Sequence, residues 1–453
     1  MRFVVIGAGP AGVQAAQTAA RLGAEVVLIE RDVVGGAANL WDCIPSKAMI
    51  ATGSLVTRAR RAEVLGLAAL EPEVDLAALG RRVREIERRL SLSLTEQLEY
   101  QGVRILRGTG RLAGPHEVEL LPEDGGAPER LDADAVLLAT GSFPRVPDWA
   151  EVDGERVLTT RQAYPPPVVP EHLVVVGSGV TGVEFVHMFR SLGAEVSLIV
   201  SRQQVLPQKD PEVAAALEAD FLERGVRLLK GARAVGIERG EKAVTIHCDD
   251  GRRVEGSHAL WCIGSVPASD GLGLEAAGVE RSPSGHVPVN HHCQSNVPHI
   301  YVAGDLSGRL PLASVAFSQG HKVAEHAMGL HTREHRHLDY DKAASAIFTE
   351  PEIADVGLAE AEAFALGRKI RVTKVPYAAN SRALIDGDTR GFVKIVSDPA
   401  TGVVLGGSIV GAHAAELVSV IALAVTANLR VLDLAESLFV HPALAEALAE
   451  AAE

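Results

Sequence analysis

Apolar residues follow two different periods along the chain. Short, continuous apolar runs at residues 3–6 and 173–176 each precede a helical stretch, as buried parallel strands do. Residues 103–112 and 118–138 alternate like strands around a Gly-Gly turn near Gly125, and further strands are expected at 392–396 and 403–410, before a helix through Leu417. The pattern predicts an α/β protein.

Residues 75–100 carry apolar side chains at helical spacing, at Leu76, Leu79, Val83, Ile86, Leu90, Leu94 and Leu98. We expect this stripe to face a core or another subunit. The same helix is rich in arginine, which we interpret as a solvated face because the whole chain is acidic.

A glycine-rich turn follows each of the two apolar runs. The first turn carries Gly7, Gly9 and Gly12, and its second strand ends at Glu30. The second turn carries Gly177, Gly179 and Gly182, and Leu192-Gly193-Ala194-Glu195-Val196 repeats the sequence found 170 positions earlier. Such glycines let the backbone approach a pyrophosphate at a helix N-terminus, and a terminal acid can bind the ribose. Two dinucleotides are therefore predicted in one chain.

The second unit lacks the acidic residue at its ribose position. Glu30 lies 23 residues after Gly7, and the position 23 residues after Gly177 is Val200, followed by Ser201 and Arg202. An arginine here can pair with a 2′-phosphate. NADPH is therefore the expected nucleotide, with NADH still accepted.

Composition narrows the class of protein. A chain of 453 residues should form three or four domains, and 47% apolar residues with 44 glycines suit a packed enzyme. The net charge of −14 argues against nucleic acid or a membrane surface as partner. The chain enters its first strand with no targeting segment before it, and residues 417–429 are too short to span a bilayer, so a cytoplasmic enzyme without an integral membrane segment is expected.

The cysteines and the clustered histidines of the chain predict no metal site. Cys43, Cys248, Cys262 and Cys293 have no metal-ligand spacing, and the last three are expected to be small buried residues. His331, His335 and His337 lie in a polar linker, where we expect solvated histidines.

The segment at residues 35–47 reads Gly-Gly-Ala-Ala-Asn-Leu-Trp-Asp-Cys-Ile-Pro-Ser-Lys. It resembles the redox segment of the flavoprotein disulfide reductases, the family of lipoamide dehydrogenase, glutathione reductase and mercuric reductase. Those enzymes use two cysteines that cycle between disulfide and dithiol. Cys43 and Lys47 match the family motif, but the position of the first cysteine is Ala38. One thiol cannot close a disulfide within this segment.

The rest of the chain resembles the family in motif order. The matching segments are Thr140-Gly141, where the chain leaves the flavin domain, the strand ending at Gly264, Gly304-Asp305 with the later Ala313, the stretch 346–357, and His441-Pro442 with Glu446. Ser265 replaces the arginine that usually follows the glycine, a departure from the family pattern. Proline-rich residues 144–170 are interpreted as a linker.

The resemblance implies two Rossmann-like dinucleotide-binding domains and an α+β C-terminal dimerisation domain. The expected division is a first part of the FAD domain at 1–143, an NAD(P) domain at 144–264, a central domain completing the FAD site at 265–335 and an interface domain at 336–453. It also implies a homodimer, in which His441 reaches the flavin of the other subunit and Glu446 orients it.

The site residues are carried over where they match. The residues expected to contact FAD are Gly7, Gly9, Gly12, Glu30, Lys47, Gly110, Thr140, Gly141, Asp305 and Ala313, and those expected to contact NAD(P)H are Gly177, Gly179, Gly182, Glu184, Ser201, Arg202 and Gly264. Lys47 and Glu184 match an ion pair near flavin N5 and the nicotinamide. The catalytic residues implied are Lys47, Glu184, His441, Glu446 and Cys43.

Four functions are compatible with these residues. The leading hypothesis is an FAD-dependent NAD(P)H:quinone oxidoreductase that passes electrons directly from flavin to acceptor, because the segment resembles that of lipoamide-dehydrogenase-like quinone reductases lacking the first cysteine. The alternatives are a soluble pyridine nucleotide transhydrogenase, a disulfide reductase using Cys43 alone, and a flavin-binding redox sensor without turnover.

Overall fold

The computed structural model describes residues 1–164, 166–330 and 337–453. His331 and His335 therefore lie outside the described residues. The chain forms two compact units, each built from separated segments. The first comprises Met1–Ser46, Ala77–Arg145 and Ser265–Tyr340, and the second comprises Lys47–Leu76, Val146–Gly264 and Asp341–Glu453. Each unit is described by itself.

The first unit holds a seven-stranded sheet in the order β17-β6-β1-β2-β3-β4-β5. Its strands are β1 (Arg2–Ile6), β2 (Glu25–Glu30), β3 (Arg104–Gly114), β4 (Glu117–Pro122), β5 (Glu129–Asp132), β6 (Ala135–Leu138) and β17 (Ile300–Val302). The five strands from β17 to β3 are parallel, whereas β4 and β5 continue antiparallel. Phe3, Val4 and Val5 are fully buried, as expected of a strand covered on both faces.

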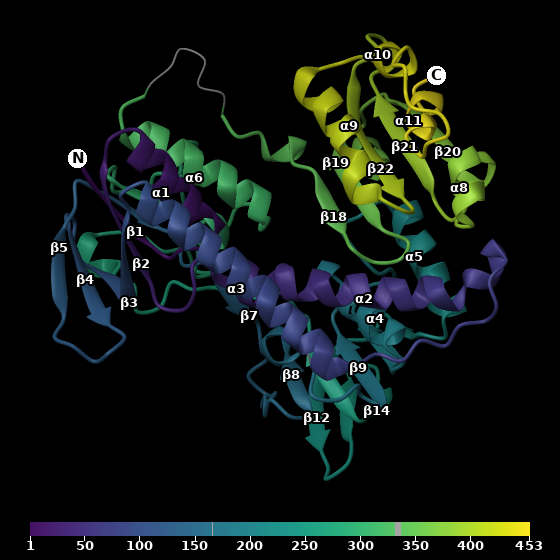
Figure 1. Ribbon diagram of the computed structural model, residues 1–453, viewed down its shortest axis with the longest axis horizontal. Coiled ribbons are helices and arrows are strands. Elements are labelled where there is room, and N and C mark those ends of the chain that lie inside the picture. The colour runs from purple at the N-terminus through teal and green to yellow at the C-terminus, as the bar shows by residue number, and fades with distance from the viewer. Residues whose placement is uncertain (165, 331–336) are drawn as a thin grey trace. The chain divides into compact units, whose positions relative to one another are not determined.

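The helices of this unit are α1 (Pro10–Arg21), α6 (Ala313–Ala327) and α3 (Leu76–Tyr100), whose first residue belongs to the other unit. α1 and α6 lie side by side (Figure 1), and a side chain at Gly320 would overlap the carbonyl oxygen of Ala11. In α3 the predicted stripe is buried at Leu79, Val83 and Leu98, whereas Leu90 is 37% exposed. The middle of this helix therefore adds little to the core.

The second unit contains the other Rossmann-type sheet, five parallel strands in the order β11-β10-β9-β15-β8. The elements are β8 (Val157–Thr159), β9 (His172–Val176), α4 (Val180–Ser191), β10 (Glu195–Val200), α5 (Pro211–Glu223), β11 (Arg227–Lys230) and β15 (His258–Trp261). The bounds of β9, α4 and β10 are those of β1, α1 and β2 shifted by 170 residues. The repeat in sequence is thus a repeat in structure.

The proline-rich stretch is more than a linker. It contributes β8, which forms the edge of the parallel sheet beside β15, and Trp149, whose ring meets Trp261 edge-on at 5.3 Å between centroids. A three-stranded antiparallel sheet of β12 (Ala234–Arg239), β13 (Val244–Cys248) and β14 (Arg253–Gly256) follows β11. In the first unit, β7 (Ser142–Pro144) pairs with β16 (Ser265–Pro267), where the chain leaves and returns.

The C-terminal part of the second unit is an antiparallel sheet in the order β18-β19-β22-β21-β20, with α9 lying against β19 and β22 (Figure 1). Its elements are β18 (Ser345–Ile347), β19 (Ile353–Gly357), α7 (Glu360–Ala365), β20 (Arg371–Pro376), α8 (Ser381–Asp386), β21 (Phe392–Ser397), β22 (Val404–Val410), α9 (Ala414–Ala427), α10 (Val431–Ala435) and α11 (Glu446–Glu450). The strands expected at 392–396 and 403–410 are confirmed as β21 and β22, and the helix expected through Leu417 is confirmed as α9.

Within the described residues, no helix combines the length and apolar character needed to cross a membrane.

Candidate functional site

The first glycine turn has the shape that a dinucleotide needs. Gly7 has a φ of +101°, and a side chain there would overlap the carbonyl oxygen of Ala139. A side chain at Gly12 would overlap the Gly7 carbonyl, so the start of α1 packs on the turn itself. Gly9 faces open space. Backbone N–H groups at the N-terminus of α1 are therefore accessible to a pyrophosphate.

Glu30, at the end of β2, is held against this turn. One carboxylate oxygen accepts a hydrogen bond from the Ala8 N–H at 2.6 Å and the other accepts from the Asp32 N–H at 2.8 Å. The carboxylate is buried yet keeps lone pairs that could accept ribose hydroxyls. These residues fit the adenosine half of FAD.

Residues at the carboxyl ends of β6 and β17 fit the other half of the same cofactor. Ser142 donates to Asp305 at 2.7 Å and leaves the second carboxylate oxygen for a ligand hydroxyl. Thr140 donates to the Ala268 carbonyl, whereas Gly110 packs against Ile6 and Ile29 in the core. The remaining predicted residues, Gly141 (φ +70°) and Ala313 at the start of α6, lie in the same unit.

Gln319 belongs to this site and was missed by the sequence interpretation. It is fully buried on α6, accepts from the Gly304 N–H at 2.7 Å and donates to the Tyr340 hydroxyl at 3.0 Å. A glutamine in an amphipathic helix gives no signal of its own. Only the fold shows that it fixes the loop that carries Asp305.

The redox segment packs on the first glycine turn. The Gly35 N–H donates to the Ala8 carbonyl at 2.8 Å, and a side chain at Gly36 would come within 2.8 Å of the Gly9 Cα. The segment then forms a π-helical turn, Ala38–Asp42, closed by the Cys43 N–H donating to the Ala38 carbonyl at 3.2 Å. The backbones of positions 38 and 43 are thus hydrogen-bonded to each other, and only position 43 carries a thiol.

The second glycine turn reproduces the first. Gly177 has a φ of +109°, a side chain there would overlap the Cys262 carbonyl oxygen, and Gly182 packs on Gly177. Gly179 faces open space with a φ of −72°, compared with −70° at Gly9. The second unit therefore has its own place for a pyrophosphate.

The ribose-binding position of the second unit differs from that of the first unit, as the sequence indicates. Val200 is fully buried at the end of β10, whereas Ser201 and Arg202 are exposed. The Arg202 carbonyl accepts from the Gly231 N–H at 2.9 Å, which fixes the backbone and leaves the guanidinium at the surface. Gly264 has a φ of +96° and open space around it at the end of β15. The arrangement can accept a phosphate, but it offers no carboxylate from position 200.

An ion pair joins α2 (Ile44–Arg60) to α4 in the second unit. Lys47 donates to one oxygen of Glu184 at 2.9 Å, and the Phe348 N–H donates to the other at 3.0 Å. The Phe348 ring lies 5.1 Å from the Lys47 ammonium, which makes a cation–π contact. Glu184 has a 7% exposed side chain, compared with 31% for Lys47. Phe348 was not predicted, because a backbone N–H carries no sequence signal.

His441 and Glu446 form a hydrogen-bonded dyad at 2.7 Å. The second Glu446 oxygen accepts from the Ala443 N–H, and this bond, together with His441, lowers the pKa of Glu446. The His441 side chain is 71% exposed, with Leu438 and Val440 exposed beside it. The dyad therefore has an oriented imidazole that stays largely exposed within the described part of the chain.

The other cysteines are buried, as predicted. Burial raises the pKa of Cys293 to about 11 and raises those of Cys248 and Cys262 as well, so all three favour the inert thiol. No disulfide involves any of the four cysteines, all of which lie in the described part of the chain. Across residues 1–164, 166–330 and 337–453, no group of three or more His, Cys, Asp or Glu side chains is arranged to hold a metal ion.

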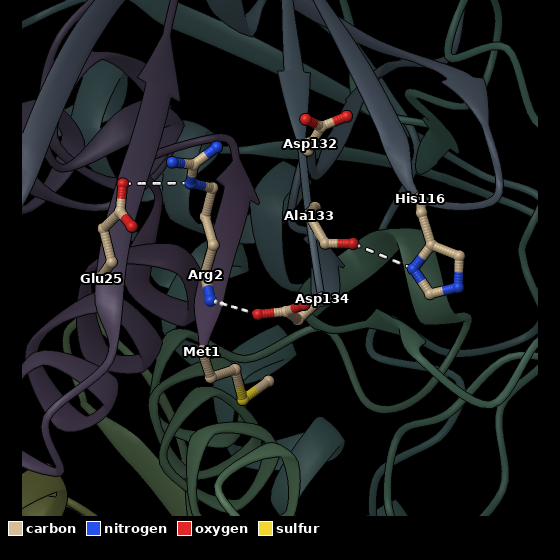
Figure 2. Close-up of a pocket in the computed structure, with 7 residues that line it drawn as sticks. All are labelled: Met1, Arg2, Glu25, His116, Asp132, Ala133 and Asp134. Atoms are coloured by element: carbon tan, nitrogen blue, oxygen red, sulfur yellow. Dashed lines mark hydrogen bonds and ion pairs between the residues drawn. The ribbon is translucent and has the colours of Figure 1, made fainter.

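A pocket of about 440 Å³ lies at the end of the first sheet away from the glycine turn (Figure 2). Its lining residues are Met1, Arg2, Glu25, His116, Asp132, Ala133 and Asp134. Arg2 begins β1 and bonds Glu25 and Asp134, so the pocket marks the amino ends of the strands. Ligands of open α/β sheets bind at the carboxyl ends, where the glycine turns lie.

Comparison with known proteins gives concordant matches. Residues 1–320 match the model of the pyridine nucleotide-disulphide oxidoreductase family, and residues 343–452 match its dimerisation domain. The chain is 42% identical to a protein of Mycobacterium tuberculosis named NAD(P)H dehydrogenase (quinone), covering 100% of this chain and 93% of that protein. It is 33% identical to the dihydrolipoyl dehydrogenase of Zymomonas mobilis, covering 99% and 96%.

Solved structures agree with these matches. The crystal structure of LpdA from Mycobacterium tuberculosis matches with a TM-score of 0.94 and 41% identity over 100% of this chain and 99% of that one. The HOCl-induced flavoprotein disulfide reductase RclA from Escherichia coli, in its Cu(II) complex, shares the fold at a TM-score of 0.89 and 24% identity, covering 100% and 98%. With its two glycine turns, this chain belongs to the pyridine nucleotide-disulphide oxidoreductase family and is an α/β flavoprotein oxidoreductase with a C-terminal dimerisation domain.

Proposed function

We propose that the chain is an FAD-dependent NAD(P)H:quinone oxidoreductase that works without an active-site disulfide. The observation that carries the proposal is the π-helical turn Ala38–Asp42: its backbone is closed by Cys43 on Ala38, and position 38 holds a methyl group in place of a thiol. One relative supports it by name, the Mycobacterium tuberculosis protein named NAD(P)H dehydrogenase (quinone).

Overall, NAD(P)H and one proton convert a quinone to a quinol. The nucleotide loses a hydride, and the quinone gains two electrons and two protons. FAD, when bound, supplies the two-electron relay between nucleotide and acceptor. The residues that would hold it are those around Gly7, Glu30 and Asp305, whereas Gly177, Gly182 and Arg202 would hold the nucleotide.

The proposed role of Lys47 and Glu184 is to order the site in which the hydride moves. A lysine bound to a carboxylate that is itself fixed by the Phe348 N–H has little freedom to rotate away. Breaking such a pair leaves a poorly solvated charge behind, which is costly. This cost explains why both members would be retained.

The proposed role of His441 is to supply a proton to the acceptor. Glu446 accepts from the Nδ1–H, so the other ring nitrogen, Nε2, is the one that can donate a proton to the acceptor when the ring is protonated. Because His441 is exposed on its own chain, we propose that its site is completed by a second subunit of the homodimer. NADPH is the proposed preferred nucleotide, supported by the exposed Arg202 beside buried Val200.

A second candidate is a disulfide reductase that uses Cys43 alone. Cys43 lies immediately before α2 and is partly exposed, and the N-terminus of a helix favours a thiolate. An acceptor screen with the purified protein, comparing naphthoquinones with lipoamide, glutathione disulfide and coenzyme A disulfide, tests the two. Turnover of the quinones alone supports direct transfer, and turnover of the disulfides alone overturns it.

A further inference from the structure

In the second unit, α4 and the part of α2 from Lys47 onward lie side by side and are joined by a row of polar contacts (Figure 1). The row, which we call the α2–α4 seam, consists of Lys47 with Glu184 at 2.9 Å, Ser54 with His187 at 3.3 Å and Thr57 with Ser191 at 3.2 Å. Its first member is the ion pair of the proposed hydride site. The others have no assigned function.

The helices approach too closely for an ordinary side chain between them. A Cβ at Gly53 would lie 2.9 Å from the Ser191 Cβ. The two helices therefore pack closely at Gly53, and the polar contacts on either side of it define their alignment. Position 47 is less than two turns from Gly53 on the same helix, so its placement depends on that alignment.

His187 lies at the centre of the seam and is fully buried. Its Nδ1 is 3.0 Å from the Arg224 guanidinium, which can only donate, so Nδ1 must be the acceptor. The ring proton then lies on Nε2 and is donated to the Ser54 hydroxyl. Burial, with Arg224 and Arg390 nearby, lowers the pKa of His187 well below its usual value, which agrees with a neutral ring.

The far side of the ring is anchored to the rest of the unit. Arg224 also donates to Asp220 at 3.2 Å and to the Ser191 hydroxyl at 2.9 Å. Asp220 in turn accepts at 2.8 Å from Arg390, which lies in the loop before β21. His187 therefore connects a fixed, charged network on one side to α2 on the other.

We propose that His187 is a positioning residue, which through Ser54 holds α2 in the alignment that places Lys47 against Glu184. The inference rests on the proposed function of that ion pair. The ring of His187 bonds Ser54 and Arg224 and lies one helical turn beyond Glu184, so it acts through the helix.

Two substitutions separate the two sides of the ring. Asparagine places an oxygen near the Nδ1 position, so His187→Asn keeps an acceptor for Arg224 and is too short to reach Ser54. Glutamine places its amide nitrogen near Nε2, so His187→Gln keeps the donor to Ser54. Ser54→Ala removes the same hydrogen bond from a half-buried position and serves if His187→Asn does not fold.

The measurement is the limiting rate of flavin reduction by NADPH in rapid mixing, together with the NADPH dissociation constant and deuterium uptake over residues 47–60 in flavin-free protein. Losing one hydrogen bond, about 0.5–1.5 kcal/mol, should slow His187→Asn and Ser54→Ala by about two- to tenfold. The dissociation constant should stay within about twofold, uptake should rise, and His187→Gln should restore both rate and uptake.

Equal behaviour of the asparagine and glutamine variants would overturn the proposal, because a purely structural defect would not distinguish the two sides of the ring. So would an unchanged rate in Ser54→Ala while Glu184→Gln slows flavin reduction. If Glu184→Gln also leaves the rate unchanged, the proposed role of the ion pair fails, and the positioning role fails with it.

Discussion

The Lys47 ammonium donates to the Glu184 carboxylate at 2.9 Å. The two residues are 137 positions apart in sequence, and their bond joins α2 to α4. The pair is asymmetric, because Glu184 is nearly buried while Lys47 keeps a 31% exposed side chain. The carboxylate is the member that loses most when its partner is removed, since it has less water to replace the contact.

Glu184→Gln should slow flavin reduction by NADPH about ten- to a hundredfold. The amide keeps the size of the side chain and loses a charge-assisted hydrogen bond worth about 1.5–3 kcal/mol. Stopped-flow absorbance of the bound flavin measures the rate. The matched control is Glu195→Gln, which removes an exposed carboxylate of β10 that pairs with Arg227 of β11. Its rate of flavin reduction should stay within about twofold of the unaltered protein. Equal rates in the two variants would contradict the role given to Glu184.

Arg202→Ala should narrow the preference for NADPH over NADH. The lost contact to a 2′-phosphate is worth about 1.5–3 kcal/mol, so kcat/KM for NADPH should fall about ten- to a hundredfold while that for NADH changes little. Arg227→Ala, on the neighbouring strand, removes a surface arginine paired with Glu195 and should alter neither value. Equal use of both nucleotides by the unaltered protein would reject the argument from Val200 and Arg202.

His187 should make stability depend on pH. Because its pKa in the folded protein is depressed from 6.5, the unfolded chain binds a proton below about pH 6.5 that the folded protein does not bind. This residue's contribution is fully present above that pH and is lost as the pH falls, by up to about 1.4 kcal/mol per pH unit. Urea unfolding between pH 5 and 8 should show a shallower dependence in His187→Gln. His286→Gln, at a partly exposed position, should keep the original slope, and identical slopes in all three proteins would refute the prediction.

His441→Gln should separate the two half-reactions. Flavin reduction by NADPH should stay within about threefold, whereas reoxidation by a naphthoquinone should slow about a hundredfold or more, the usual contribution of a general acid. Because the pKa of Glu446 is lowered, the dyad should persist until the pH falls below the ordinary range of a carboxyl group. Double-mixing stopped flow resolves the steps. Slower reduction with unchanged reoxidation would place His441 elsewhere in the cycle.

The sequence predicts the parts of the site that depend on backbone shape. Gly7 and Gly177 must adopt a positive φ where a side chain would strike the neighbouring strand, and this requirement leaves a glycine in the sequence. Glu30 follows from its spacing to Gly7, whereas Lys47 and Glu184 follow from the family resemblance. The repeat of 170 residues extends this logic to whole elements.

Other residues of the site could not be recognised from any pattern in the sequence. Phe348 acts through its backbone N–H, and Gln319 and His187 are polar residues whose partners come from distant segments. Sequence periodicity indicates that a helix has a buried face, but it does not identify the groups that meet there. β8 was hidden because three residues among many prolines are too few to show alternation.

The central claim is that electrons leave the flavin directly, and Cys43→Ser tests it most directly. With Ala38 in place of a second thiol, Cys43 cannot form a disulfide within its segment, so the usual dithiol relay is not available. Steady-state turnover of NADPH with a naphthoquinone should therefore remain within about threefold of the unaltered protein, because only the flavin's surroundings change. A variant that binds FAD and is reduced by NADPH at the normal rate, yet no longer turns over quinone, would contradict the account.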